Sequence, residues 1–261
     1  MERDEVLNKF YNDSCNEDVR LDSKHGQVEF LTTTKYIEEY LKPDSKILEV
    51  GAATGRYSLY YAKKGYNVTA IEYVDHNVEI LKSKITDEMD IIAEQGDGCD
   101  LSRFEDNTFD ITLVLGPLYH LFDDKDINSA IKEAIRVTKQ DGIIAIAYLT
   151  SDSTMISWGL LGNHLIDGYP KFFDENFKIR RFPEGIFSHF YISEFKELMG
   201  NYNVELLHNV ATDGFSFYVK DKIDSLTDEE FDTWMRYHLS TCEREDLQGY
   251  SNHMLYICKK N

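Results

Sequence analysis

Residues 46–56 read KILEVGAATGR, and this stretch decides the fold. A hydrophobic strand over 46–50 runs into a turn of small residues, which lets the backbone bend tightly and approach a ligand before the next helix. The turn lacks the G-x-x-x-x-G-K-[ST] pattern of a phosphate-binding loop. Gly51 and Gly55 are also spaced wrongly for the G-x-G-x-x-G pattern of dinucleotide-binding proteins. Glu49 would repel a pyrophosphate but attract an ammonium group, which favours a ligand with an amino-acid end.

Short apolar runs alternate with helical patterns along the rest of the chain. The run GIIAIAYL over 142–149 is apolar enough to be covered on both faces, which is typical of strands in a parallel sheet. We therefore expect a doubly wound α/β fold with a mostly parallel, seven-stranded sheet and helices on both faces. The expected strands are 46–50, 67–72, 90–94, 109–115, 142–149, 203–210 and 253–259. The expected helices are 28–41, 56–64, 77–85, 126–138 and one that runs from a capping box at Thr227 to about Arg244.

The chain is strongly acidic, with 28 Lys and Arg against 47 Asp and Glu and a formal net charge of −19. Such a charge repels nucleic-acid backbones and anionic membranes, so we expect neither as a partner, although a local basic groove would escape this argument. The N-terminus MERDEVLNKFYND has no apolar signal region, and no run approaches 18 apolar residues, so we expect a cytoplasmic protein. The four cysteines are scattered, and no clustered His or Asp pattern indicates a metal site.

The turn over 49–55 resembles motif I of the class I S-adenosylmethionine-dependent methyltransferases, written [D/E]-x-G-x-G-x-G. Ala53 stands where the family has its middle glycine, and its methyl group narrows the approach to the methionine moiety. Three further landmarks follow in the family's order. Glu72 ends the second strand, where the family's acidic residue accepts hydrogen bonds from the ribose hydroxyls. Asp97 lies in a G-D-G string that resembles the adenine-binding turn, and D-x-x-F-D over 106–110 introduces the fourth strand.

Each landmark has a purely structural explanation when it is taken alone: a tight turn, a solvated acid at a strand end, or an Asp-Gly turn. Their common order and spacing favour the family. The resemblance implies that the methyl donor is S-adenosyl-L-methionine, which leaves as S-adenosyl-L-homocysteine. Related enzymes fold an N-terminal segment over the donor, which adds Tyr11 and Arg20; a surface position for Arg20 is the alternative. The residues expected to bind the donor are Glu49, Gly51, Ala52, Ala53, Gly55, Arg56, Glu72, Tyr73, Asp97, Gly98, Leu115, Gly116, Tyr11 and Arg20.

The fourth expected strand ends in LGPLYHL over 115–121, and loops at this end of a parallel sheet lie beside the ligand. The string is similar to one found in small-molecule methyltransferases and differs from the [N/D]-P-P-[Y/F] string of enzymes that methylate amide or adenine nitrogens. Tyr119 and His120 are the expected catalytic residues. His120 is either a general base or a packing residue, and Tyr119 either stacks on the adenine or the acceptor or fills the core.

The predicted organisation is one methyltransferase domain over residues 1–261. It comprises an N-terminal helical segment that covers the cofactor (1–45), a cofactor-binding core (46–150), an aromatic-rich lid inserted after the fifth strand (151–202) and the final strands with an inserted helix (203–261). The predicted function is methyl transfer to a small-molecule acceptor by in-line displacement. A catalytically silent S-adenosylmethionine-binding protein, an RNA or protein methyltransferase and a nicotinamide-dependent oxidoreductase remain as alternatives. The sequence leaves the acceptor, the methylated atom and the oligomeric state open.

Overall fold

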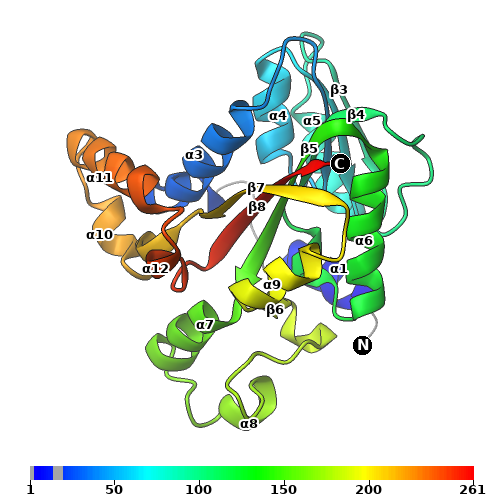
Figure 1. Cartoon of the computed structure of the whole chain (residues 1–261). Helices are drawn as coiled ribbons and strands as arrows, with labels where there is room; N and C mark the ends of the chain where they lie inside the picture. Colours follow the sequence, from blue (N-terminus) through cyan, green and yellow to red (C-terminus); the bar gives the residue numbers. More distant parts are fainter. Residues whose placement is uncertain (1–2, 14–19) are drawn as a thin grey trace.

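The computed structural model describes residues 3–13 and 20–261, and its centre is an eight-stranded sheet (Figure 1). The strands follow the order β3-β2-β1-β4-β5-β8-β7, and the short β6 pairs with β5. All pairs among β1 to β6 are parallel, whereas β8 runs antiparallel to both β5 and β7. The strands are β1 (Lys46–Val50), β2 (Asn67–Glu72), β3 (Ile91–Gln95), β4 (Phe109–Val114), β5 (Thr138–Thr150), β6 (His189–Phe190), β7 (Val204–Ala211) and β8 (His253–Lys260).

This sheet confirms the mostly parallel α/β prediction with one correction, because it has eight strands rather than seven. The additional strand is β6, whose two residues pair with Leu149 and Thr150 of β5. A strand of two residues carries no alternating pattern, so the sequence gives no sign of it. Six of the seven expected strands end and begin within one residue of their expected positions; β5 begins four residues early, at Thr138, because α6 (Asp124–Val137) leads directly into it.

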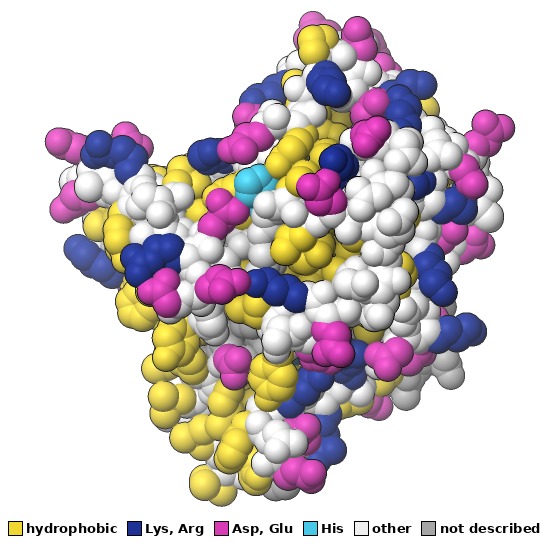
Figure 2. Space-filling view, viewed as in Figure 1, with side chains coloured by type: hydrophobic (Ala, Val, Ile, Leu, Met, Phe, Trp, Pro, Cys, Tyr) yellow, Lys and Arg dark blue, Asp and Glu magenta, His cyan; other side chains and the backbone are white. Residues whose placement is uncertain are grey.

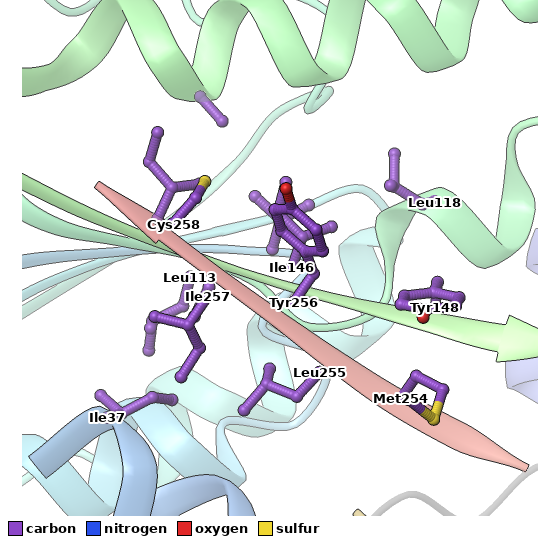
Figure 3. Packing of buried hydrophobic residues seen from close by; sticks show 14 of the residues in the cluster. Ile37, Leu113, Leu118, Ile146, Tyr148, Met254, Leu255, Tyr256, Ile257 and Cys258 are labelled. Atoms are coloured by element: carbon purple, nitrogen blue, oxygen red, sulfur yellow. The ribbon is translucent and has the colours of Figure 1, made fainter. Parts of the chain in front are cut away.

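Helices cover both faces of the sheet. Figure 3 shows α3 (Lys24–Glu38) and α6 on opposite sides of β8, with Leu255 and Ile257 pointing toward α3 and Tyr256 and Cys258 toward α6. All four of these β8 side chains are buried. Both faces of β8 are therefore buried over residues 254–258, although this strand runs antiparallel to its neighbours. The remaining helices of the core are α4 (Arg56–Lys63) and α5 (Asp75–Ser83).

The helix expected over 126–138 is α6, and its apolar face is buried as predicted. Ile127, Ala130, Ile131 and Ala134 are each 3% exposed or less. The helix begins two residues earlier than expected because the Asp123 carboxylate caps it, accepting a hydrogen bond from the Asp126 amide at 2.8 Å.

The insertion after β5 lies beyond the carboxyl end of that strand (Figure 1). It contains α7 (Ser151–Thr154), a π-helical turn (Met155–Leu161), α8 (Tyr169–Phe172), β6 and α9 (Ile192–Met199). The helix α1 (Arg3–Asp13) lies at the same edge of the sheet. Figure 2 shows hydrophobic side chains gathered over the insertion, where Leu160, Leu161 and Ile166 are all more than half exposed.

The chain between β7 and β8 forms α10 (Lys220–Asp224), α11 (Asp228–Thr241) and α12 (Glu245–Gln248). The predicted capping box opens α11: the Glu230 amide donates to Thr227 Oγ1 at 3.3 Å, and the Thr227 amide donates to Glu230 Oε2 at 2.8 Å. The helix ends at Thr241, three residues before the expected end. Within the described ranges, 3–13 and 20–261, no helix combines the length and apolar composition that crossing a bilayer requires.

Candidate active site

The turn after β1 adopts the backbone geometry that its small residues predict. Gly51 and Gly55 have φ angles of 75° and 92°, in the left-handed region that favours glycine. A Cβ added at Gly51 would lie 2.6 Å from Pro117 Cδ, so the glycine is also needed for the loop after β4 to pack against the turn. Ala53 has a φ of 47°, a conformation that costs an alanine about 1 kcal/mol or more relative to glycine.

A cavity of about 550 Å³ opens at this edge of the sheet, and we call it the main cavity. One wall is the turn after β1, a second is the loop after β4, and the rest comes from α1, the insertion and the segment before β8. Aromatic rings dominate the lining. The cavity is lined by, among others, Phe10, Tyr11, Arg20, Glu49, Gly51, Ala52, Ala53, Tyr57, Leu115, Gly116, Tyr119, Trp158, Phe172, Phe182, Phe187, Phe217 and His253.

Glu49 is the most unusual group in this lining, since its side chain is a carboxyl in a residue that is only 2% exposed. The Ser58 hydroxyl donates a hydrogen bond to Glu49 Oε2. Burial raises the pKa of Glu49 to about 8, and the hydrogen bond from Ser58 only partly offsets this. A buried carboxyl that borders a cavity is therefore ready to ionise when a cation enters.

A second, smaller cavity of about 50 Å³ adjoins the main one, and we call it the side cavity. Gly51 and Ala53 line both cavities, and Glu72 lines the side cavity. The Glu72 carboxylate accepts hydrogen bonds from the Ala53 amide at 2.8 Å and the Val74 amide at 2.9 Å. Glu72 thus ties the motif I turn to the end of β2, and its role at the ribose stays a prediction.

Asp97 lies next to the side cavity, at a third, open cavity that also involves Tyr73 and Gly96. Arg3 of α1 forms an ion pair with the Asp97 carboxylate at 3.1 Å, and its guanidinium carbon lies 4.5 Å from the centre of the Tyr73 ring. The Cys99 amide donates to Asp97 Oδ1 at 2.9 Å. Shared lining residues therefore connect Glu49, the turn, Glu72 and Asp97 at one edge of the sheet.

Comparison with known proteins agrees with this geometry. Residues 48–146, which contain the turn, Glu72, Asp97 and the loop after β4, match the family described as Methyltransferase domain. Residues 48–146 of this chain are a methyltransferase domain.

Relatives of the methyltransferase domain support the same assignment. The chain is 27% identical to YqeM of Bacillus subtilis over 42% of its length and 33% identical to a demethylmenaquinone methyltransferase of Renibacterium salmoninarum over 40%. The aligned parts span 45% and 41% of those two proteins, less than half of each. A SAM-dependent methyltransferase of Methanosarcina mazei has the same fold, with a TM-score of 0.57 and 19% identity over 86% of this chain and 96% of that one.

The cofactor of such a domain is S-adenosylmethionine, and the residues present fit it. Glu49 is a buried carboxyl whose charge burial opposes, and a carboxyl of this kind suits an ammonium group. The turn at Gly51 leaves no side chain between the backbone and the cavity. Glu72 ends β2 and Asp97 follows β3, so both carboxyls lie at the edge where the resemblance places the ribose and the adenine.

Most of the expected donor-binding residues line one of these three cavities, and the two exceptions are Gly55 and Arg56. Gly55 packs beneath the turn, where an added Cβ would lie 2.1 Å from Leu81 Cδ1. The Arg56 guanidinium donates to Asp22 Oδ1 at 2.6 Å and is absent from the lining of the three cavities. Arg20 does line the main cavity, where it donates two hydrogen bonds to Glu29, at 2.8 and 3.1 Å.

The two expected catalytic residues have different surroundings. Tyr119 lines the main cavity and is 9% exposed, and its burial raises the pKa of its hydroxyl well above the usual range. His120 lines the side cavity instead. Its Nδ1 lies 2.9 Å from the Ile186 carbonyl oxygen, so the neutral ring carries its proton there, and Nε2 accepts from the Tyr11 hydroxyl at 2.7 Å. This arrangement favours the packing interpretation of His120.

Sequence reasoning missed one group beside the main cavity, formed by Glu29, Asp213 and His253, of which His253 lines the cavity. His253 Nδ1 lies 2.8 Å from Asp213 Oδ2 and 3.6 Å from Glu29 Oε2. The three residues come from α3, from the turn after β7 and from the start of β8. Positions so far apart in the chain share no motif, so only the fold brings them together.

Proposed function

We propose that the protein transfers a methyl group from S-adenosylmethionine to a small, largely apolar acceptor bound in the main cavity. One observation carries this proposal: a single cavity joins Glu49 and the motif I turn to the aromatic wall of the insertion. A volume of about 550 Å³ is typical of small-molecule sites, which span roughly 300–1,000 Å³. The donor's amino-acid end and the acceptor would then share one enclosed space.

The donor supplies an activated methyl carbon bonded to a sulfonium, so the chain's own task is placement. Glu49 binds the ammonium group, and the small residues over 51–53 allow the donor to approach the backbone. The aromatic wall holds the acceptor and excludes water, and its ring faces attract the positive charge of the sulfonium. Placement of this kind is worth up to about 7–11 kcal/mol in a displacement reaction.

The lining of the main cavity favours an apolar, flat acceptor. The insertion contributes the rings of Trp158, Phe172, Phe182 and Phe187, and the segment after β7 contributes the ring of Phe217. We assign Tyr119 to the acceptor wall and His120 to the positioning of α1 through Tyr11. The net charge of −19 supports a small molecule over RNA, because it repels phosphates.

The test measures S-adenosylhomocysteine formation by the purified protein with S-adenosylmethionine and mixtures of small apolar acceptors. We expect product with at least one mixture and no binding of NAD in calorimetry. Glu72→Ala should weaken S-adenosylhomocysteine binding at least tenfold, whereas Glu205→Ala, an exposed acid on β7, should leave it unchanged. Donor binding without product from any acceptor would refute the proposal in favour of a silent binding protein.

A further inference from the structure

The Asp213–His253 pair lies at the same edge of the sheet as the methyl-donor site. His253 pairs with Leu149 in the register of β8 against β5, so it lies at the carboxyl end of a central strand. Its ring centre is 6.0 Å from that of Tyr119 and 6.4 Å from that of Phe217, and all three residues line the main cavity. The pair therefore borders the space assigned to the acceptor.

The hydrogen bonds of the pair fix which nitrogen of His253 faces that space. Asp213 Oδ2 lies within hydrogen-bond distance of His253 Nδ1, at 2.8 Å. Asp213 Oδ1 accepts hydrogen bonds from the Ser251 hydroxyl at 2.7 Å and from the Asn252 amide at 3.0 Å. The side chain of Asp213 is 5% exposed, so it is held firmly. Among the described residues, no hydrogen bond reaches His253 Nε2, whereas Nδ1 has a second neighbour, Asn252 Nδ2, at 3.1 Å. A carboxylate on Nδ1 with Nε2 toward a cavity is the arrangement that makes an imidazole a proton acceptor.

We propose that His253, oriented by Asp213, is the general base that accepts the proton of a hydroxyl-bearing acceptor during methyl transfer. This inference rests on the proposed function. The acceptor O–H bond breaks and its proton moves to His253 Nε2. The oxygen's electron pair forms the new O–CH₃ bond as the carbon–sulfur bond of the donor breaks, with that bond's electrons remaining on sulfur. The imidazolium that results is stabilised by Asp213 and Glu29. His253 is then a catalytic residue, and Asp213 is a positioning residue.

The charges around His253 set the direction of its titration. Burial lowers the pKa of His253, but Glu29 and Asp213 outweigh it, so the pKa is raised above the ordinary value of 6.5. Because the base must be unprotonated, activity should rise with pH through this raised pKa. The charged and titratable groups that face the pair come from every element around it. They are Glu29 on α3, Arg20 before α3, Asp213 and Tyr218 after β7, His238 on α11, His189 on β6, Tyr119 after β4 and, through Glu29, Lys220 on α10.

The side chains of Glu29, Asp213 and His253 are also close enough to hold a metal ion, with ligand atoms within 4.8 Å of one another. Arg20 already supplies Glu29 with a positive partner through two hydrogen bonds, which favours the role in proton transfer. If a chelator abolished methyl transfer and added Mg²⁺ or Zn²⁺ restored it, the inference would be overturned.

A first experiment needs no acceptor. In the full chain with ¹⁵N-labelled histidine, the resonance that His253→Gln removes should titrate above 6.5 and show the Nδ1–H tautomer when neutral. Glu29→Gln should move that midpoint to lower pH, because it removes one of the two anions. A midpoint at or below 6.5, or the Nε2–H tautomer, would refute the assignment even if methyl transfer itself were confirmed.

A second experiment compares two acceptors of the same shape, 2-naphthol and 2-naphthalenethiol, because a thiol loses its proton far more easily. His253→Gln should reduce methylation of the naphthol on the order of a hundredfold or more and of the thiol less than threefold. His208→Gln removes a histidine that pairs with Glu243 outside the cavity and should change neither rate. Equal losses for both acceptors, or naphthol methylation that His253→Gln leaves intact, would overturn the inference. If wild-type protein methylates neither acceptor nor any mixture, the proposed function fails, and the titration still decides the state of His253.

Discussion

The buried carboxyl of Glu49 leads to a prediction that separates stability from binding. In the folded protein the pKa of Glu49 is about 8, against an ordinary value of 4.5. The unfolded chain therefore ionises this group first, and folding becomes less favourable as pH rises from 4.5 toward 8. At about 1.4 kcal/mol per pH unit, the penalty reaches about 3 kcal/mol at pH 7. Glu49→Gln removes the titration and keeps the shape of the side chain.

We expect the Glu49→Gln variant without ligand to be more stable than the wild type by about 3 kcal/mol at pH 7 and equally stable below pH 4.5. Urea unfolding across this pH range measures the difference. Glu205→Gln, an exposed acid paired with Lys259, is the control and should show no such pH dependence. A variant that gains no stability between pH 5 and pH 8 would refute the buried, neutral state of Glu49.

The same carboxyl must ionise when an ammonium group binds beside it. With a pKa of about 8, roughly nine in ten copies of the free protein carry the proton at pH 7, so binding of S-adenosylhomocysteine should release about 0.9 proton. Calorimetry in two buffers with different ionisation enthalpies measures this release. In Glu49→Gln the release should vanish and the affinity should fall at least tenfold, since a charged hydrogen bond is lost. Binding without proton release by the wild type would contradict the assignment of the ammonium to Glu49.

Two further predictions concern the loops around the donor site. Gly51→Val should weaken S-adenosylhomocysteine binding at least tenfold in calorimetry, because even a Cβ would lie 2.6 Å from Pro117; unchanged affinity would show that the turn can move. Tyr11→Phe should lower the thermal unfolding midpoint and cost about 1 kcal/mol, because it removes the hydrogen bond to His120. Equal unfolding midpoints for Tyr11→Phe and the wild type would remove Tyr11 as an anchor of α1.

The central sheet and the turn after β1 could be predicted from the sequence because their signals are local. A strand such as β5 is buried on both faces and shows it as a continuous apolar run, and the turn needs small residues at fixed spacing. Glu49 and Glu72 could be placed because strand ends of a parallel sheet meet at one edge.

The rest of the site depends on contacts between distant parts of the chain. Nothing near His253 in sequence indicates Asp213 or Glu29, and nothing near His120 indicates that Tyr11 and the Ile186 carbonyl occupy its ring nitrogens. Arg56 follows the motif directly, yet its guanidinium donates a hydrogen bond to Asp22 and does not line the three cavities. Such pairings depend on how the N-terminal helices and the insertion pack against the rest of the protein. The spacing of residue types along the chain carries no information about that packing.

The position of α1 sets the sequence of events in a catalytic cycle. Contacts from Arg3 to Asp97 and Tyr73, from Tyr11 to His120 and from Phe10 to Phe187 hold it over the side cavity, which is about a tenth the volume of the main one. A nucleoside can settle against Glu72 only if this helix first swings outward. We therefore expect an ordered cycle in which the donor enters first and its spent form departs last, with helix opening as the step that paces turnover.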